Sequence, residues 1–327
     1  MQQDAAVFSL ERKKDKCMNK TAYIFPGQGS QFVGMGEDVY EKYDCAKKVF
    51  DEADEVLDYS IKNICFHGPE DELKRTLNSQ PALLTHSYAM MKVAEETGIT
   101  KKYPPSYMAG HSLGEYSALA SDHALKFQDA VRLAHVRGKL MNECAEKTAG
   151  SMSAIIALKK EDVEAVCKDT GTYPANFNCP GQIVISGESD KIKEAAKLAK
   201  EKGAKLAISL AVSGAFHSPL MQNAADNLKP FIDKCEMKMP DVPVVGNTKA
   251  RYLKSVDQMK EELANQVCMC VQWEDTIQLL LSEGVDTFIE VGPGTVLCGL
   301  IKRIAPEAVS YHIGNIEDVE ALLKQEA

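Results

Sequence analysis

The chain has 327 residues, of which 45% are hydrophobic and 26% charged, and its formal net charge is −9. This length and apolar content suit one large globular domain, or one large and one small, with a buried core. The negative charge argues against a general nucleic-acid-binding protein, because such proteins usually carry a basic face. No apolar run approaches the roughly 20 residues of a membrane span, so we expect neither a nucleic acid nor a membrane as partner.

The ten cysteines are scattered along the chain and form no Cys-x-x-Cys pair. Cys268 and Cys270 are too close together to look like half of a zinc site, so we expect no metal and no bound cofactor. Free buried thiols are typical of a reducing compartment, and the charged N-terminus lacks the apolar region of a signal peptide. The sequence therefore predicts a cytoplasmic protein.

The N-terminal segment, residues 1–20, carries a charged run at 11–16 and no periodic hydrophobic pattern. We interpret it as a poorly ordered extension. Met18 is an alternative natural start, which would make residues 1–17 an upstream or added segment, and the sequence leaves both interpretations open.

Ordered structure is predicted to begin with a buried strand at 21–25, which leads into a tight loop at 26–31. Amphipathic helices are predicted over 38–58, 81–97 and 127–147, because apolar side chains recur there at helical spacing.

The segment Gly110-His111-Ser112-Leu113-Gly114 has the pattern Gly-x-Ser-x-Gly and lies between an apolar run and a helix-like stretch that begins at Glu115. This context predicts a strand, a tight turn that carries Ser112, and a helix. The glycines suit such a turn because the backbone folds back on itself there. The helix N-terminus would offer N–H groups to a developing oxyanion. An ordinary turn is the alternative.

Near residue 150 the spacing of apolar residues along the sequence changes. The pattern predicts, in order, a strand, a helix, two strands, a helix and a strand, over 152–158, 160–168, 173–178, 182–186, 190–202 and 204–212. This β-α-β-β-α-β order is typical of a small ferredoxin-like subdomain. Because these elements lie in one continuous segment of the chain, we expect the subdomain, residues 149–213, to be inserted into a large domain made of 21–148 and 214–327.

The last third of the chain alternates helical and extended patterns. It reads as helical from His217 to about 235, extended at 242–245, helical around 256–283, a buried strand at 287–291, and a helix from about 295. With the N-terminal elements, this alternation predicts an α/β fold with a mainly parallel sheet. Ligands are then expected beyond the carboxyl ends of the strands.

His217 is the strongest candidate for a base beside Ser112, whose hydroxyl needs a base within hydrogen-bond reach to become nucleophilic. It follows residues 213–216, which we interpret as a strand end, and precedes a turn at Ser218-Pro219. His111 should leave its turn in another direction, so a structural role is expected. The other histidines are expected at surface or packing positions: His67, His86, His123, His135 and His312.

Three further positions have a functional and an ordinary interpretation. Arg137 lies on the predicted helix 127–147, where it either snorkels to solvent or turns inward and binds a carboxylate through two nitrogens. Asn178 is a candidate substrate contact, against the alternative of a turn-forming asparagine. The loop Gly27-Gln28-Gly29 lacks the lysine and spacing of a phosphate-binding loop, so we expect it to bring a backbone N–H beside Ser112.

Five motifs taken together resemble those of the malonyl-CoA:acyl-carrier-protein transacylase family, in that family's order and spacing, from about residue 20 to the C-terminus. The motifs are Phe25-Pro26-Gly27-Gln28-Gly29-Ser30-Gln31, Gly110-His111-Ser112-Leu113-Gly114-Glu115-Tyr116, Arg137-Gly138, Gly214-Ala215-Phe216-His217-Ser218, and Gln266 with Val271-Gln272-Trp273. The resemblance implies an α/β-hydrolase-like core joined to a ferredoxin-like subdomain, which agrees with the predicted architecture.

The resemblance also implies catalytic roles. Ser112 would attack the malonyl thioester, and His217 would take its proton and later protonate the departing thiolate. Backbone N–H groups of Gln28 and Leu113 would form the oxyanion hole. In this family the histidine is oriented by a backbone carbonyl rather than by an acid, and Gln266 occupies the matching position.

The substrate site implied by the resemblance centres on Arg137. Its guanidinium would pair with the free carboxylate of the malonyl group and so favour malonyl over acetyl. Phe216 resembles the malonyl-type pattern, in which a bulky ring limits the room for an α-methyl group. Gln266 and Asn178 complete the expected substrate contacts.

The implied reaction is ping-pong: malonyl-CoA acylates Ser112, and the phosphopantetheine thiol of acyl carrier protein collects the malonyl group for fatty acid synthesis. A serine hydrolase or thioesterase, and a malonyltransferase of a polyketide pathway, stay open as alternatives. A catalytically silent carrier-binding subunit is a third, against which the presence of Ser112 and His217 argues. We expect a monomer with a basic rim for the acidic carrier, and Lys302 and Arg303 are candidates for it.

Overall fold

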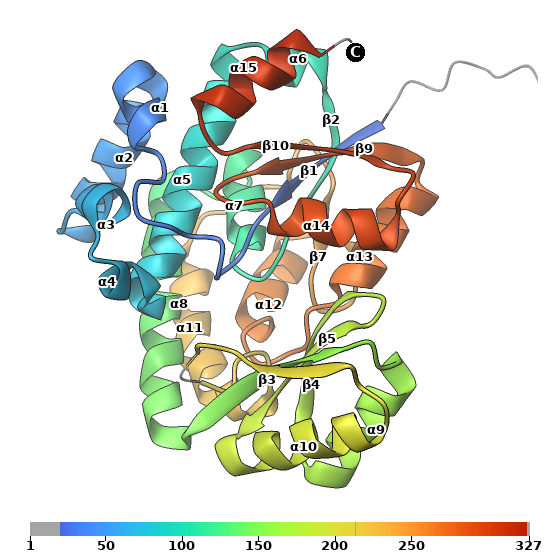
Figure 1. The fold of residues 1–327 in the computed structure, drawn as a ribbon. Coiled ribbons are helices and arrows are strands. Elements are labelled where there is room, and N and C mark those ends of the chain that lie inside the picture. The colour runs from blue at the N-terminus through green and yellow to red at the C-terminus, as the bar shows by residue number, and fades with distance from the viewer. Residues whose placement is uncertain (1–19, 213, 326–327) are drawn as a thin grey trace, which may run out of the picture.

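The computed structural model describes residues 20–212 and 214–325, so the extension predicted for 1–20 lies outside the described residues except for Lys20. The chain forms a six-stranded sheet and a separate four-stranded sheet, which Figure 1 shows in the upper and lower parts of the molecule. No helix in the described ranges is long and apolar enough to cross a membrane.

The strands of the larger sheet are, in sheet order, β10 (Val309–Ile313), β9 (Val285–Val291), β1 (Lys20–Phe25), β2 (Pro105–Gly110), β7 (Val244–Gly246) and β8 (Arg251–Tyr252). Those of the smaller sheet are β4 (Tyr173–Cys179), β5 (Gln182–Glu188), β3 (Gly150–Ile156) and β6 (Leu206–Ser209). All neighbours in the larger sheet are parallel except β7 and β8, whereas all neighbours in the smaller sheet are antiparallel.

The α-helices are α1 (Glu37–Lys42), α2 (Asp44–Leu57), α3 (Ile61–His67), α4 (Glu70–Lys74), α5 (Thr76–Glu96), α6 (Ile99–Lys102), α7 (Gly114–Ser121), α8 (Phe127–Thr148), α9 (Lys160–Thr170), α10 (Ser189–Glu201), α11 (Gln222–Lys234), α12 (Val256–Asn265), α13 (Trp273–Ser282), α14 (Val296–Ile304) and α15 (Ile316–Lys324). A short 3₁₀ turn, η1 (Pro219–Met221), precedes α11.

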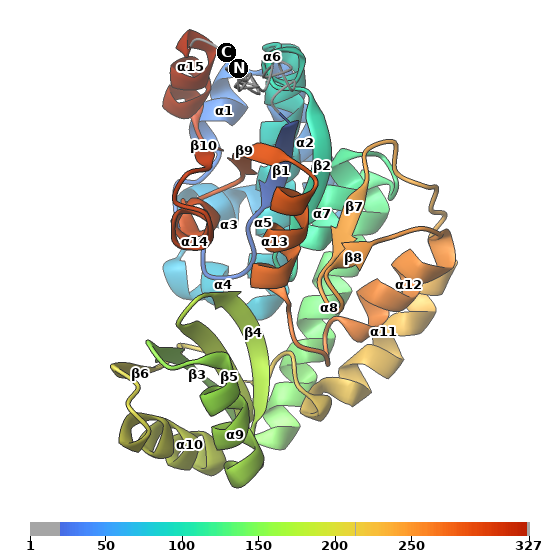
Figure 2. The same ribbon diagram turned by 90° about the vertical axis from the view of Figure 1, so that its right-hand side faces the viewer.

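The central strand β1 is buried on both faces. Tyr23 and Phe25 pack into a core cluster with residues of α5, α7 and α8, whereas Ala22 and Ile24 pack into a second cluster with residues of α13 and α14. Figure 2 shows these helices on the two sides of the sheet. A parallel sheet needs such cover on both faces, and the predicted α/β class with a mainly parallel sheet is confirmed.

The smaller sheet has its own core against α9 and α10, which lie beneath it in Figure 1. The order β3-α9-β4-β5-α10-β6 and the strand arrangement β4-β5-β3-β6 are those of a ferredoxin-like unit. The β-α-β-β-α-β order is therefore confirmed, while the boundaries at 149 and 213 stay a prediction.

Two predicted helices are interrupted in the structure. The helix predicted over 38–58 breaks at Tyr43, whose backbone is extended, although buried apolar residues continue on both sides of the break. The helix predicted around 256–283 ends at Asn265, and α13 begins only at Trp273. In the intervening loop Val271 exchanges backbone hydrogen bonds with Ala175 and Phe177 of β4, so tertiary pairing overrides local helical preference there.

The strand predicted at 204–212, with a strand end just before His217, is also wrong in extent. Strand β6 stops at Ser209, and no strand is present at 214–216. Leu210 still donates its backbone N–H to the Met152 carbonyl of β3, and residues 210–212 line the cavity beside Ser112.

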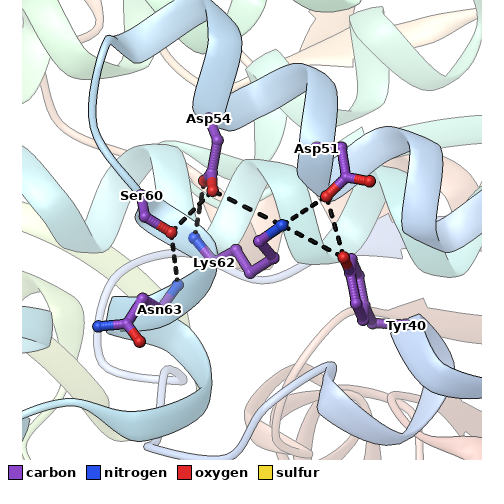
Figure 3. A network of polar contacts seen from close by, with 6 residues as sticks. All are labelled: Tyr40, Asp51, Asp54, Ser60, Lys62 and Asn63. Carbon is purple, nitrogen blue, oxygen red and sulfur yellow. Dashed lines mark hydrogen bonds and ion pairs between the residues drawn. The ribbon is translucent and has the colours of Figure 1, made fainter.

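A polar network ties α1, α2 and the start of α3 together (Figure 3). Lys62 Nζ donates to Asp51 Oδ1 at 2.5 Å and to the Tyr40 hydroxyl at 3.2 Å. Asp54 accepts from the Ser60 hydroxyl, which caps α3 by accepting the Asn63 N–H. This network lies near the surface, since the side chains of Lys62 and Asp51 are 27% and 42% exposed.

Candidate active site

The turn between β2 and α7 places Ser112 in a left-handed backbone conformation, with φ of 51°. Its two glycines are required by close approach. A Cβ on Gly110 would lie 1.9 Å from the carbonyl carbon of Gly114, and a Cβ on Gly114 would lie 2.0 Å from the carbonyl oxygen of Phe25. A serine with positive φ is strained, and the surrounding contacts hold it in this geometry.

Asn247, just after β7, braces this turn, a role that the sequence analysis did not assign. Its side-chain oxygen accepts the Ser112 N–H at 2.7 Å, and its side-chain nitrogen donates to the Gly110 carbonyl at 2.7 Å. Asn247 is 1% exposed, so both bonds are shielded from water. Its position beyond the carboxyl end of a parallel strand was the available signal.

His217 lies within hydrogen-bond reach of the serine. Its Nε2 is 2.8 Å from Ser112 Oγ, and its Nδ1 faces the carbonyl oxygens of Gln266 at 2.8 Å and Met269 at 3.2 Å. A carbonyl can only accept, so Nδ1 carries the proton and Nε2 is free to accept the serine proton. Backbone carbonyls thus fix the base form of the ring without a carboxylate.

The environment keeps His217 neutral. Burial, with a further contribution from the positive charge of Arg137, lowers the pKa of His217 to about 3. At neutral pH the ring is therefore in the form that can act as a general base.

Arg137 turns inward from α8 and does not snorkel, because it is only 1% exposed. Its Nη2 donates to Ser112 Oγ at 3.0 Å and to Gln266 Oε1 at 2.8 Å, while its Nη1 donates to Gln80 Oε1 at 2.7 Å. Gln80 was not predicted from the sequence as a site residue. The signal available for it was a polar side chain directly before Pro81, a pattern that resembles a helix start more than a site residue.

The positive charge of Arg137 has no directly paired carboxylate among the described residues, since its hydrogen-bond partners are two amide oxygens and a hydroxyl. Burial lowers the pKa of the guanidinium from its usual high value, and Tyr116 and Glu115 oppose that shift. A buried guanidinium with neutral partners, directed at the nucleophile, is suited to an anionic acyl group.

Gln28 and Leu113 lie beside the serine, as the oxyanion-hole hypothesis requires. Gln28 lines the same cavity as Ser112, and its side chain donates to the Thr76 hydroxyl. Within ranges 20–212 and 214–325, the backbone N–H groups of Gln28 and Leu113 donate to no protein acceptor. Both amides are thus available to a ligand oxygen, and their oxyanion role stays a prediction.

A cavity of about 490 Å³ opens in front of Ser112 and is lined by residues that follow β1 and β2 of the larger sheet and by residues of β3 and β4 of the smaller sheet. Phe216 lies in its wall beside His217. Asn178 is not among the lining residues; its side-chain oxygen lies 2.9 Å from His111 Nε2, and Asn176, two residues earlier on β4, lines the cavity instead. The structure therefore places Asn178 behind His111, at one remove from the cavity.

The remaining expectations concern ions and the carrier. The described residues contain no group of three or more His, Cys, Asp or Glu side chains that could hold a metal ion. Arg303, one candidate for the carrier rim, donates to the Gln182 side chain and to the Pro180 carbonyl, and so links α14 to the turn between β4 and β5. Lys302 is exposed.

Comparison with known proteins finds relatives that all point to one class of enzyme. A family model described as "Acyl transferase domain" matches residues 22–315. The malonyl CoA-acyl carrier protein transacylase of Bacillus subtilis (strain 168) is 46% identical, over 94% of this chain and 97% of the relative. The corresponding protein of Staphylococcus aureus (strain MRSA252) is 40% identical, over 93% of this chain and 98% of the relative.

Similar solved structures are also malonyltransferases. An acyl carrier protein S-malonyltransferase from Vibrio cholerae has a TM-score of 0.90 at 38% identity, with 93% of this chain and 100% of that chain covered. A malonyl-transacylase in complex with its type II PKS acyl-carrier protein also has a TM-score of 0.90 at 38% identity, with 94% and 100% covered.

The fold, the buried serine and histidine, and the family match over most of the chain together define the class as the acyl transferases. Within that class, the chain belongs to the malonyl-CoA:acyl-carrier-protein transacylase family. The resemblance inferred from the five sequence motifs is confirmed.

Proposed function

We propose that this enzyme transfers the malonyl group from malonyl-CoA to the phosphopantetheine thiol of acyl carrier protein and so supplies fatty acid synthesis. The observation that carries the proposal is the position of Ser112 Oγ, which lies 2.8 Å from the base nitrogen of His217 and 3.0 Å from the guanidinium of Arg137. A nucleophile held between a base and an unpaired cation is suited to an acyl group that itself carries a negative charge.

Acylation proceeds through a tetrahedral intermediate. Ser112 Oγ attacks the thioester carbonyl while His217 Nε2 takes the hydroxyl proton, and the N–H groups of Gln28 and Leu113 donate to the oxygen that becomes negative. The carbon–sulfur bond then breaks, and His217 returns the proton to the CoA thiolate. The Gln266 and Met269 carbonyls at Nδ1 stabilise the imidazolium that forms in between.

Arg137 selects the acyl group. A malonyl ester on Ser112 carries a free carboxylate, which binds the guanidinium in place of the present Ser112 contact, whereas an acetyl ester leaves the buried charge without an anion. Phe216, in the cavity wall, restricts substituents at the α-carbon.

The second half-reaction reverses the first. The carrier thiol loses its proton to His217 and attacks the malonyl ester. The bond between the acyl carbon and Ser112 Oγ then breaks, and His217 returns the proton to Oγ. The structural relative in complex with a type II PKS acyl-carrier protein supports a carrier as acceptor and favours a polyketide carrier as a second candidate acceptor.

Nine cysteines in the described part of the chain are free thiols, in keeping with the cytoplasm as the proposed location. We continue to expect a monomer.

The direct test compares transfer with hydrolysis. Purified enzyme is mixed with malonyl-CoA and phosphopantetheinylated acyl carrier protein, and malonyl carrier and free malonate are measured over time. We expect carrier malonylation to be faster than malonate release, and the Ser112→Ala variant to do neither. Dominant malonate release would support the serine hydrolase alternative and contradict the proposed transfer reaction.

A further inference from the structure

Glu115 is a buried acidic residue that the proposed reaction does not use. It lies in the first turn of α7, three residues after Ser112, and is 0% exposed. Its Oε2 accepts the side-chain N–H of Gln266 at 2.7 Å and the backbone N–H of Asn247 at 3.3 Å. Both of these residues contact the nucleophile segment directly, so Glu115 lies immediately behind the machinery around Ser112.

We propose that Glu115 is a positioning residue, which fixes the orientation of the Gln266 amide and, through that amide, holds the Arg137 guanidinium in place for the malonyl carboxylate. This inference rests on the proposed function, because it assigns the means by which Arg137 is kept ready.

The Gln266 amide has one favourable orientation in this setting. Its nitrogen donates to two acceptors, Glu115 Oε2 at 2.7 Å and the Ser112 carbonyl at 2.9 Å, and its oxygen accepts from Arg137 Nη2 at 2.8 Å. Rotation of the amide by a half-turn would place an oxygen against two acceptors and a nitrogen against a cationic donor. Glu115 supplies one of the two acceptors that exclude this rotation.

The orientation matters because Arg137 Nη2 divides its bonds between Gln266 and Ser112 Oγ. The Gln266 oxygen fixes one edge of the guanidinium plane, and Gln80 fixes the other. When the amide turns away, Nη2 loses a neutral acceptor in a buried site, and the guanidinium plane is free to tilt away from the malonyl carboxylate. Bidentate recognition depends on that plane.

Packing alone does not explain an acid at this position. The second oxygen, Oε1, is buried without a hydrogen-bond partner among the described residues, which is unfavourable for a carboxyl group. Burial, and then the nearby Glu262, raise the pKa of Glu115 well above its usual range. An apolar side chain would fill the same space at less cost, which points to Oε2 as an acceptor as the reason for the residue.

The acceptor account makes a sharp distinction between substitutions. Glu115→Gln keeps an oxygen that can accept the Gln266 N–H at the Oε2 position, whereas Glu115→Ala removes the acceptor. Glu290→Ala is the matched control. Glu290 is also 0% exposed and also accepts two N–H groups, the backbone N–H groups of Leu297 and Cys298, but it does not contact Gln266.

The experiment measures kcat and KM for malonyl-CoA and for acetyl-CoA in each variant. We expect Glu115→Ala to lower the malonyl-to-acetyl ratio of kcat/KM about 3- to 10-fold, mainly by raising KM for malonyl-CoA, as the loss of one hydrogen bond implies. Glu115→Gln should restore most of the ratio, and Glu290→Ala should leave the ratio unchanged even if it destabilises the fold. An equal loss for both acyl groups in Glu115→Ala would overturn the proposal.

A double-mutant cycle checks the route through the amide. If Glu115 acts through Gln266, the ratio in Glu115→Ala/Gln266→Ala is no lower than in Gln266→Ala alone; additive losses would contradict this route. Glu115→Asp, whose side chain is one methylene shorter, serves the same test if the alanine variant does not fold. Arg137→Ala in the same assay separates the role of Glu115 from the proposed function. An unchanged malonyl-to-acetyl ratio of kcat/KM in Arg137→Ala would count against the proposed function, and not against Glu115 alone.

Discussion

The molecule contains two polar networks of similar geometry and very different surroundings. Around Lys62, contacts of 2.5 to 3.2 Å join neighbouring helices, with side chains 27% and 42% exposed (Figure 3). Around Ser112, contacts of 2.7 to 3.0 Å join Arg137, Gln80, Gln266 and His217, of which Arg137 is 1% and His217 6% exposed. Because water competes more strongly with the first network than with the second, distance alone does not tell how much a contact contributes.

The networks also differ in charge balance. Lys62 faces two carboxylates, Asp51 and Asp54, so its charge is compensated within the protein. Arg137 faces only neutral acceptors, which leaves its charge available to a ligand. A satisfied, half-exposed ion pair supports the fold, whereas a buried, unbalanced cation next to a nucleophile is a site for an anionic substrate.

Removal of the buried cation should give the largest effect. Arg137→Ala is expected to lower malonyl transfer about 10- to 150-fold, the loss of a charge-assisted hydrogen bond of about 1.5 to 3 kcal/mol, while acetyl transfer is unchanged or improved. The measurement is kcat/KM with malonyl-CoA and acetyl-CoA in parallel.

Arg132→Ala is the control for that variant, because Arg132 lies on the same helix α8 but is 58% exposed and pairs with Asp129. It should leave both rates unchanged. An equal loss of malonyl and acetyl transfer in Arg137→Ala would place Arg137 outside the acyl site.

Burial of His217 should be visible as acid destabilisation. The pKa of His217 is about 3 in the folded protein, against about 6.5 in the unfolded chain. The unfolded state therefore binds the extra proton between these values, and stability is lost as the pH falls through this window. From pH 7.5 to pH 5 this histidine alone accounts for a decrease in the free energy of unfolding of about 2 kcal/mol.

Denaturant unfolding at the two pH values, in the native protein and in His217→Gln, measures that contribution as a difference. The decrease should be smaller by about 2 kcal/mol in His217→Gln. His67→Gln serves as the control, since the His67 side chain is 61% exposed and its replacement should leave the decrease unchanged. An identical decrease in all three proteins would show that His217 is not held neutral by its surroundings.

The half-exposed network should give the smallest effect. Lys62→Met retains most of the aliphatic stem and removes the charge, and the free energy of unfolding should fall by no more than about 1 kcal/mol. Malonyl transfer should not change. A loss of several kcal/mol, or a loss of activity, would remove the distinction between the two networks.

The same contrast explains what could be predicted from the sequence. The turn that carries Ser112 was predictable, because all of its signals lie within one short segment. The strand, the helix and the two glycines that the tight turn requires are neighbours in the sequence. The inward direction of Arg137 was one of two interpretations until family resemblance favoured it. Periodicity could not choose, since a buried arginine and a snorkelling arginine occupy the same helical positions.

Gln80, Asn247 and Glu115 were missed for a different reason. Each is a polar residue whose partners lie far away in sequence, such as Gln80 with Arg137 and Asn247 with Ser112. The break after Asn265 was missed for the same reason, because the loop that follows is held by β4 and by His217. Local patterns report which residues can form an element, and tertiary contacts decide where the element ends.

The central claim is that Ser112 carries a malonyl group during turnover. Intact-mass analysis of the protein, after brief mixing with malonyl-CoA and acid quenching, tests it most directly. We predict one malonyl adduct on the native protein, absent from Ser112→Ala and retained in Lys62→Met. A native protein that turns over malonyl-CoA without an adduct, or an adduct that persists in Ser112→Ala, would contradict the account.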